Sequence, residues 1–265
     1  MIPYTRIKIF NKTNGGLSSA RNAGLDICTG DYISFIDSDD HIPNNFVSEL
    51  VNSLEIAKSD LSVCRIIRFE DETNNFIEVF YPFKDGLYES KCYLKKILLH
   101  KVDNASWNKL YKREIVGDLR FKVGIINEDI PFVTEYIERC NSISYTNKTS
   151  YNYRRRKNSI TQIVKPNIMD YVYNALSLSE IVSSPLKSYV KPYLYYETIN
   201  AYANIISSDN RDSLIQQQLL CRNIIKNNIV NFIFNKNLKI KMKLKYVLCL
   251  LSPNISRFII KNIFK

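Results

Sequence analysis

Three carboxylates, Asp37, Asp39 and Asp40, lie within four positions of one another, directly after the apolar run YISFI. Like charges at this spacing repel one another and raise one another's pKa, so their grouping calls for a compensating charge. Hard oxygen ligands in this number suit Mg²⁺ or Mn²⁺, which share their coordination shell with substrate phosphates. The sequence therefore predicts a metal site at these three residues. The alternative is an acidic turn that only caps the following helix.

A glycine-containing segment upstream suits an anionic ligand. Residues 14–24 read NGGLSSARNAG, so two glycines precede the predicted N-terminus of a helix. Glycines let the backbone approach a ligand, and helix N-termini favour anions. Arg21 lies in the first turn and can pair with a phosphate group. The alternative is an ordinary strand-to-helix loop that carries a surface arginine.

Two later segments carry residues suited to proton transfer and to sugar binding. Glu128 and Asp129 of INEDIPF begin a predicted helix, where acids complement the helix dipole, but one of them could also act as a general base. Trp107, Asn108 and Lys109 of SWNKLYKRE combine an aromatic ring with an amide and an amine. Sugars stack on aromatic rings and bond to such groups. A core tryptophan beside a lysine whose charged end reaches solvent is the alternative.

Strand and helix patterns alternate in the first part of the chain. Apolar or alternating runs predict strands, and apolar residues at helical spacing predict helices. The expected order is strand 5–10, helix 18–28, strand 32–36, a helix opened by Pro43 and Asn44, and strand 60–69. This succession predicts an α/β fold with a mostly parallel sheet and flanking helices. Further along we expect strand 77–83, helix 91–99, a helix from Glu128 to Cys140, strand 142–156 and a helical region from residue 167.

The charge of the chain is concentrated near its C-terminus. The net charge of the 265 residues is +11, and no acidic residue follows Asp212, whereas ten basic residues do. The segment LKIKMKLK, residues 238–245, alternates strictly, which formally favours a strand. We interpret it instead as a basic amphipathic segment at an anionic membrane surface, because such lipids attract each nearby lysine. A helical bundle with a solvated lysine face is the alternative.

Other features exclude several classes of protein. The six cysteines form no C-x-x-C pair, which indicates buried thiols in a reducing cytoplasm rather than a zinc site. The basic run in YNYRRRKNSIT, residues 151–161, could neutralise phosphate, but no motif of a nucleic-acid-binding fold accompanies it. We therefore expect no nucleic-acid partner.

The order of these segments carries more information than any one of them. NGGLSSARNAGL, GDYISFIDSDD, WNKLYKRE, EDIPF and YNYRRRKNSIT follow one another along the chain. This series resembles the family 2 glycosyltransferases, especially the bacterial members that build capsule, exopolysaccharide or lipopolysaccharide. The resemblance covers residues 5–162. It implies a GT-A fold and an inverting transfer from a nucleotide-sugar, usually a UDP-sugar, to a saccharide acceptor that can be lipid-linked.

The resemblance also implies roles for particular residues. Asp37 and Asp39 would hold Mg²⁺ or Mn²⁺ on the donor diphosphate, with Asp40 adjacent. Asp129 would be the catalytic base, with Glu128 as its neighbour. Arg21 would touch the donor, and the remaining residues of these motifs are predicted to contact it as well: Asn14, Gly16, Asp37, Trp107, Asn108 and Lys109.

The chain departs from the family pattern at its start. The family begins with a strand ending in P-x-Y-N, a helix and a second strand ending in a D-D-G-S-like turn, and this sequence has none of them. We therefore predict an N-terminally truncated GT-A domain at residues 1–165, which binds nucleotide-sugar weakly by itself. A helical region at 166–265 would carry the basic tail, giving a cytoplasmic protein peripheral to the inner face of the membrane. The alternatives are a nucleotidyltransferase of similar fold and an inactive remnant or assembly partner.

Overall fold

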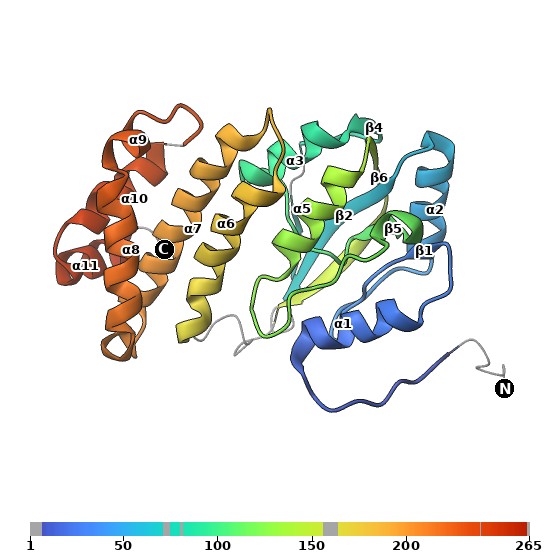
Figure 1. Cartoon of the computed structure of the whole chain (residues 1–265), viewed down its shortest axis with the longest axis horizontal. Coiled ribbons are helices and arrows are strands. Elements are labelled where there is room, and N and C mark those ends of the chain that lie inside the picture. The colour runs from blue at the N-terminus through green and yellow to red at the C-terminus, as the bar shows by residue number, and fades with distance from the viewer. Residues whose placement is uncertain (1–6, 71–74, 80–81, 156–163, 239, 264–265) are drawn as a thin grey trace.

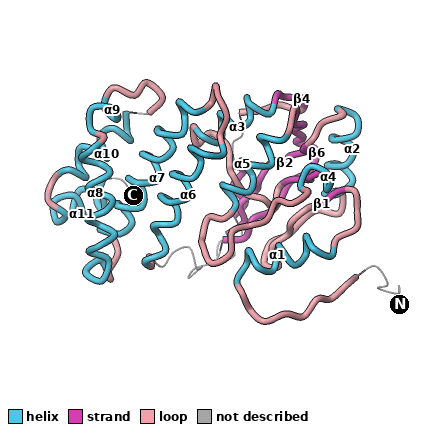
Figure 2. Tube along the Cα trace, viewed as in Figure 1, coloured by secondary structure: helices cyan, strands magenta, loops and turns pink. Residues whose placement is uncertain are grey.

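The computed structural model describes residues 7–70, 75–79, 82–155, 164–238 and 240–263, which form an α/β part followed by a helical part (Figure 1). Figure 2 shows the strands gathered at one end of the molecule and helices alone at the other. The elements of the α/β part are α1 (Gly16–Ile27), β1 (Tyr32–Ile33), α2 (Phe46–Ala57), β2 (Leu61–Glu70), β3 (Asn75–Val79), β4 (Gly86–Glu89), α3 (Ser90–Leu98), β5 (Lys109–Lys112), α4 (Arg113–Val116), α5 (Asp129–Arg139) and β6 (Ser142–Arg155).

The helical part begins with the short 3₁₀ turn η2. Its elements are η2 (Pro166–Met169), α6 (Asp170–Ile181), α7 (Lys187–Ser207), η3 (Arg211–Leu214), α8 (Ile215–Asn227), α9 (Ile229–Ile233), α10 (Ile240–Leu250) and α11 (Pro253–Ile263). None of the helices in the described ranges is long and apolar enough to cross a membrane.

The described strands form one sheet in the order β1-β5-β2-β6-β4, with β3 paired to β2. The α/β architecture is as predicted, but the prediction of a mostly parallel sheet is wrong. Among the described strands only β2 and β6 pair in parallel, and the other pairs are antiparallel. The reason is that β5 inserts between β1 and β2 and runs against both. The strand–helix alternation reports chain order alone, so it gave no sign of this insertion.

Most predicted elements are present with shifted ends. Helix 18–28 begins at Gly16, strand 32–36 contracts to Tyr32–Ile33, and strand 77–83 becomes Asn75–Val79. The predicted strand 5–10 is wrong where the structure describes it, because residues 7–10 are exposed and have no regular structure. Its residues 5 and 6, residues 80 and 81 of the predicted strand 77–83, and residue 156 of the last predicted strand lie outside the described residues.

The buried side chains gather in two hydrophobic clusters. The first joins the sheet to α1–α5, and the second fills the helical part. Helices α6 and α7 contribute to both: Leu178 and Val190 pack in the first, while Val172 and Ile199 pack in the second. These two helices therefore connect the sheet to the basic C-terminal segment. The domain boundary after residue 165 stays a prediction.

Candidate active site

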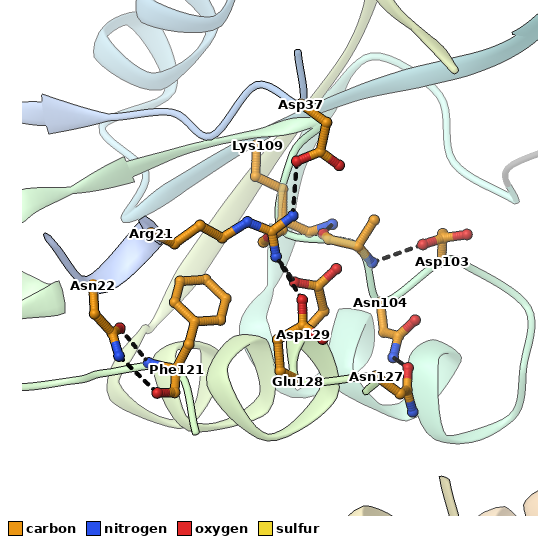
Figure 3. Close-up of polar contacts among 12 residues, drawn as sticks. Arg21, Asn22, Asp37, Asp103, Asn104, Lys109, Phe121, Asn127, Glu128 and Asp129 are labelled. Atoms are coloured by element: carbon orange, nitrogen blue, oxygen red, sulfur yellow. Dashed lines mark hydrogen bonds and ion pairs between the residues drawn. The ribbon is translucent and has the colours of Figure 1, made fainter. Parts of the chain in front are cut away.

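Arg21 brings three predicted site residues together. Its Nη1 donates to Glu128 Oε1 at 3.0 Å and to Asp129 Oδ1 at 2.7 Å, and its Nη2 donates to Asp37 Oδ1 at 3.0 Å. Figure 3 shows the guanidinium between Asp37 on one side and Glu128 and Asp129 on the other. Residues more than a hundred positions apart in sequence thus meet around one cation. The segments that carry Asp37 and Asp129 therefore lie at the same site.

Aromatic rings fix the position of this arginine. The guanidinium carbon lies 5.2 Å from the centre of the Phe121 ring and 6.0 Å from that of Phe35, within the range of cation–π attraction. Asn22, the next residue of α1, donates to the Phe121 carbonyl and accepts from its N–H group, both at 2.8 Å. The two bonds tie α1 to the loop that carries Phe121. Phe121 contacts Phe35 and stacks on Phe132 of α5, so the rings beside the arginine belong to one packed aromatic group.

A tyrosine of β6 orders the acidic turn after β1. The Tyr151 hydroxyl accepts from the Asp37 N–H group at 3.0 Å and donates to Asp40 Oδ2 at 2.8 Å. The other oxygen of Asp40 accepts from the Arg154 N–H group at 2.8 Å. Both carboxylate oxygens of Asp40 therefore bond to β6, which makes Asp40 an anchor of the turn.

The prediction of a three-carboxylate metal site at Asp37, Asp39 and Asp40 needs correction. In the part of the chain that the structure describes, no group of three or more His, Cys, Asp and Glu is arranged to hold a metal ion. Asp40 bonds to β6, and Asp37 pairs with Arg21. Magnesium sites completed by substrate phosphates need only one or two carboxylates. Asp37 and the exposed Asp39 fit that smaller requirement.

The loop before α5 is held by helix α6. Asn127 has φ 57°, the left-handed region that asparagine tolerates better than most residues. Asn174 donates to the carbonyls of Ile126 and Asn127, both at 3.0 Å, and Asp170 accepts from the Ile126 N–H group at 2.9 Å. These bonds fix the backbone that delivers Glu128 and Asp129. The helical part thus orients the candidate base.

A cavity of about 290 Å³ opens beside Asp129. Trp107 and Tyr153 form one wall, with parallel rings 5.6 Å apart. Of the three carboxylates bound to Arg21, Asp129 is the one that the described lining includes. The lining residues are Ile66, Arg68, Asp103, Asn104, Ala105, Trp107, Asp129, Tyr153 and Tyr171. Aromatic faces, the amide of Asn104 and charged groups beside the Asp129 carboxylate make a pocket suited to a sugar.

Asn108 and Lys109 do not line this cavity, which corrects their predicted role as direct sugar contacts. Both are fully buried. Asn108 donates to the Cys64 carbonyl at 2.7 Å and accepts from Lys109 Nζ, also at 2.7 Å. Lys109 further donates to the Ala105 carbonyl. The pair therefore supports the loop that carries Ala105 and Trp107.

Asn14 and Gly16 lie at the exposed start of α1. The Gly16 N–H group donates to Asn14 Oδ1 at 3.0 Å, and Gly16 has φ 82°, a left-handed conformation that suits glycine. Their contact with a donor stays a prediction.

Burial sets the electrostatics of the cluster. Desolvation, followed by repulsion from Asp129, raises the pKa of Glu128 above its ordinary value. Desolvation lowers the pKa of Lys109 to about 8, although Asp103 and Asp129 oppose the shift. For Arg21, burial lowers the pKa, but Asp129 and Asp37 outweigh that effect and the net shift is upward. Arg21 is therefore the fixed cation of the site.

Several residues of the site went unnoticed in the sequence. Phe35 and Phe121 pack on Arg21, and Asp170 and Asn174 hold the catalytic loop from a distant helix. None of the four belongs to a motif with chemistry of its own. The paired tyrosines of YNYRRR were the one available signal, and they supply both Tyr151 and the cavity residue Tyr153.

Comparison with known proteins agrees with this geometry. Residues 3–120 match the model of glycosyl transferase family 2. Glycosyltransferase GlyA of Streptococcus pneumoniae serotype 4 (strain ATCC BAA-334 / TIGR4) is 30% identical over 182 residues, which cover 65% of this chain and 26% of GlyA. These matches identify residues 3–120 as a segment similar to glycosyl transferase family 2. EpsH of Bacillus subtilis (strain 168) is 28% identical over 200 residues, which cover 70% of this chain and 56% of EpsH.

The chain spans a quarter of GlyA and little more than half of EpsH. Its fold is similar to that of S. aureus TarS 1–349 in the crystal structure with UDP-GlcNAc, with a TM-score of 0.57 at 15% identity. That likeness covers 91% of this chain and 72% of the TarS chain. It supports the GT-A-like fold predicted from the motifs.

Proposed function

We propose that this chain transfers a sugar from a nucleotide-sugar, a UDP-sugar in the first instance, to a saccharide acceptor in the synthesis of a bacterial surface polysaccharide. The observation that carries the proposal is the Arg21 cluster, which joins Asp37 to Asp129 beside an aromatic cavity. Two crystal structures of the structurally similar S. aureus TarS 1–349 support the donor class, because one is in complex with UDP-GlcNAc and the other with UDP.

Asp129 is the proposed base. It lines the cavity, and one of its oxygens bonds to Arg21. The carboxylate would remove the proton of the acceptor hydroxyl while the hydroxyl oxygen attacks the anomeric carbon. A single displacement of this kind inverts the anomeric configuration. Arg21 holds the carboxylate in place, and the bonds of Asn174 to the preceding loop hold its backbone.

The proposed metal is Mg²⁺ or Mn²⁺, with Asp39 and Asp37 as its protein ligands and the donor phosphates completing the shell. Such an ion would neutralise negative charge on the departing nucleotide diphosphate. The turn that carries both residues is fixed by Tyr151 and Asp40. A metal at the acidic turn after β1 would then stabilise the leaving group. The base at the start of α5 would act on the acceptor hydroxyl, on the other side of the anomeric carbon.

We further propose that the basic C-terminal segment associates peripherally with an anionic membrane surface. Ten basic residues and no acidic ones follow Asp212 in the sequence. A lipid-linked saccharide acceptor would lie at such a surface.

The test is a product assay at millimolar donor concentration, because the sequence predicts weak donor binding. The chain is incubated with Mn²⁺, single UDP-sugars and a bacterial membrane extract as acceptor, and UDP release is followed by chromatography. The proposal expects release with at least one UDP-sugar and its loss in EDTA. A nucleotidyltransferase would instead release pyrophosphate from a nucleoside triphosphate and a sugar phosphate. An inactive assembly partner would give neither product.

A further inference from the structure

A second cavity, of about 560 Å³, lies in the helical part of the molecule. It is bounded by residues 98–101 at the end of α3, by α7, and by residues of α10 and the segment before it. Its described lining shares no residue with that of the cavity at Asp129. The transfer mechanism proposed above does not use it.

The cavity combines an apolar floor with a cationic rim. Leu98, Pro192 and Met242 are buried side chains of its wall. Four lysines also line it, and none of the described lining residues is acidic. The four are Lys101, Lys236, Lys241 and Lys245. Such a lining suits a ligand with an anionic group and an apolar body.

Two of these lysines are one helical turn apart on α10. Lys241 and Lys245 are separated by four residues, a spacing at which like charges destabilise a helix. Burial, followed by the charge of Lys241, lowers the pKa of Lys245. A bound anion would offset both effects. The pair is therefore the strongest candidate in the cavity for contact with a phosphate group.

The same helix exposes an apolar stripe. Ile240, Leu244 and Val247 recur at helical spacing and are 76%, 55% and 47% exposed. At 100° per residue they share one face of α10, and Lys241 and Lys245 follow at one edge of it. The opposite face carries Met242, Tyr246 and Cys249, which are buried against the rest of the helical part. Figure 1 shows α10 beside α7 and α8, at the end of the molecule away from the sheet.

We propose that this cavity binds the phosphate headgroup of an anionic lipid, with Lys241 and Lys245 on the phosphate and the acyl chain along the exposed stripe of α10. A free phosphate would contact the lysines but leave the apolar stripe in water. A lipid covers both, and the positive charge of the rim selects an anionic one. The site deepens the membrane association proposed above and rests on it, whereas it is independent of the transfer chemistry.

The test measures binding of soluble lipid by the full chain in calorimetric titrations without any sugar donor. The probes are dihexanoyl phosphatidic acid below its micelle concentration, inorganic phosphate, and dihexanoyl phosphatidylcholine. We expect phosphatidic acid to bind at least tenfold more tightly than either of the others. At about 1 kcal/mol per lysine, the double variant K241Q/K245Q should bind it about 30-fold more weakly.

The matched control is K226Q/K243Q, which removes the same charge from α8 and α10 without touching the described cavity lining. It should stay within twofold of the unmodified chain. Leu244→Ser changes an exposed side chain and should weaken phosphatidic acid binding while leaving inorganic phosphate binding unchanged. Thermal melting of each variant verifies its fold.

Three results overturn the proposal. An equal loss in the control pair means that only net charge matters, and equal binding of inorganic phosphate means a free-phosphate site. Equal binding of phosphatidylcholine means that the lysines do not select the ligand. Because no donor is present, a failed transfer assay leaves these outcomes untouched. Asp129→Asn should retain full lipid binding.

Discussion

Replacing Arg21 by methionine should destabilise the fold far more than an ordinary loss of a surface ion pair. The Arg21 side chain is 7% exposed, and its removal leaves three carboxylates of 10–23% exposure facing one another. Removing one partner of a buried ion pair lowers the free energy of unfolding by about 3–5 kcal/mol. Asp37 and Asp129 retain some contact with water, so we expect the lower end, about 3 kcal/mol at pH 7.

The loss of stability in R21M should be larger at neutral pH than at acidic pH. Without the cation, the clustered carboxylates have pKa values in the folded state above those in the unfolded chain. Folding then binds protons, so the stability of the variant falls as pH rises through those raised values. The difference between R21M and the unmodified chain should therefore be smaller at pH 4.5 than at pH 7. Urea denaturation followed by circular dichroism at both pH values measures it.

Arg120→Met is the matched control. Arg120 pairs with Asp26 at 2.8 Å, but these side chains are 39% and 59% exposed. Exposed pairs contribute about 0–1 kcal/mol, so the control should lose no more than that at either pH. If R21M lost no more than R120M, or lost the same at both pH values, the account of Arg21 as the organising cation would be refuted.

Three further predictions concern the loop before α5, the wall of the cavity and a buried carboxylate on α7. Asn174→Ala should reduce the transfer rate about tenfold and stability by about 1–3 kcal/mol, because two loop carbonyls lose their donor. Trp107→Leu should raise the KM for the sugar substrate several-fold with little change in kcat, because it removes one wall of the cavity. Burial raises the pKa of Glu197 from 4.5 to about 7, which corresponds to about 3 kcal/mol. The protonated Glu197 contributes this free energy of unfolding at low pH, and most of the contribution is lost between pH 5 and 8. Glu197→Gln should remove this dependence on pH.

Each of these three has an outcome that contradicts it. An Asn174→Ala chain with normal kinetics would show that α6 does not orient the loop. A Trp107→Leu chain that loses kcat while KM stays constant would place the ring in the chemistry rather than in the binding wall. If the free energy of unfolding of Glu197→Gln, measured in urea, still fell with rising pH, another group would be responsible for that fall. His100, 3.7 Å from Glu197, is the nearest candidate.

Sequence reasoning found the residues whose chemistry is carried by a short motif. Asp129 begins α5, Arg21 lies within α1, and Asp37 follows β1 by four residues, so each lies in or near an element that the local pattern predicted. Their meeting could be inferred from the order of the motifs. The structure adds that a single arginine joins them.

The remaining features depend on contacts between distant segments. The insertion of β5 between β1 and β2 reversed the predicted strand pairing, because local patterns do not report which strands are neighbours. Asn108, Lys109 and Asp40 have the right chemistry for a site, yet the fold buries the first two and bonds the third to β6. Burial of a polar side chain cannot be predicted from its immediate neighbours in sequence.

The segment at residues 238–245 shows the same limit in another form. Its strict alternation formally favoured a strand, but residues 240–250 form helix α10. The reason lies in the residues beyond it: Met242, Tyr246 and Cys249 recur at helical spacing and are buried. The interpretation as a basic amphipathic segment at an anionic membrane surface stays a prediction.

The most direct test of the central claim is the Asp129→Asn variant in the UDP-release assay, with Glu135→Gln on the same helix as its control. Asparagine keeps an oxygen that can accept from Arg21, so the fold and donor binding should be retained. We predict that the rate falls at least 100-fold, as for the loss of a general base, while Glu135→Gln stays within twofold. Donor affinity, measured by calorimetry, should change less than threefold. A variant that keeps more than a tenth of the rate would contradict the assignment of Asp129 as the base.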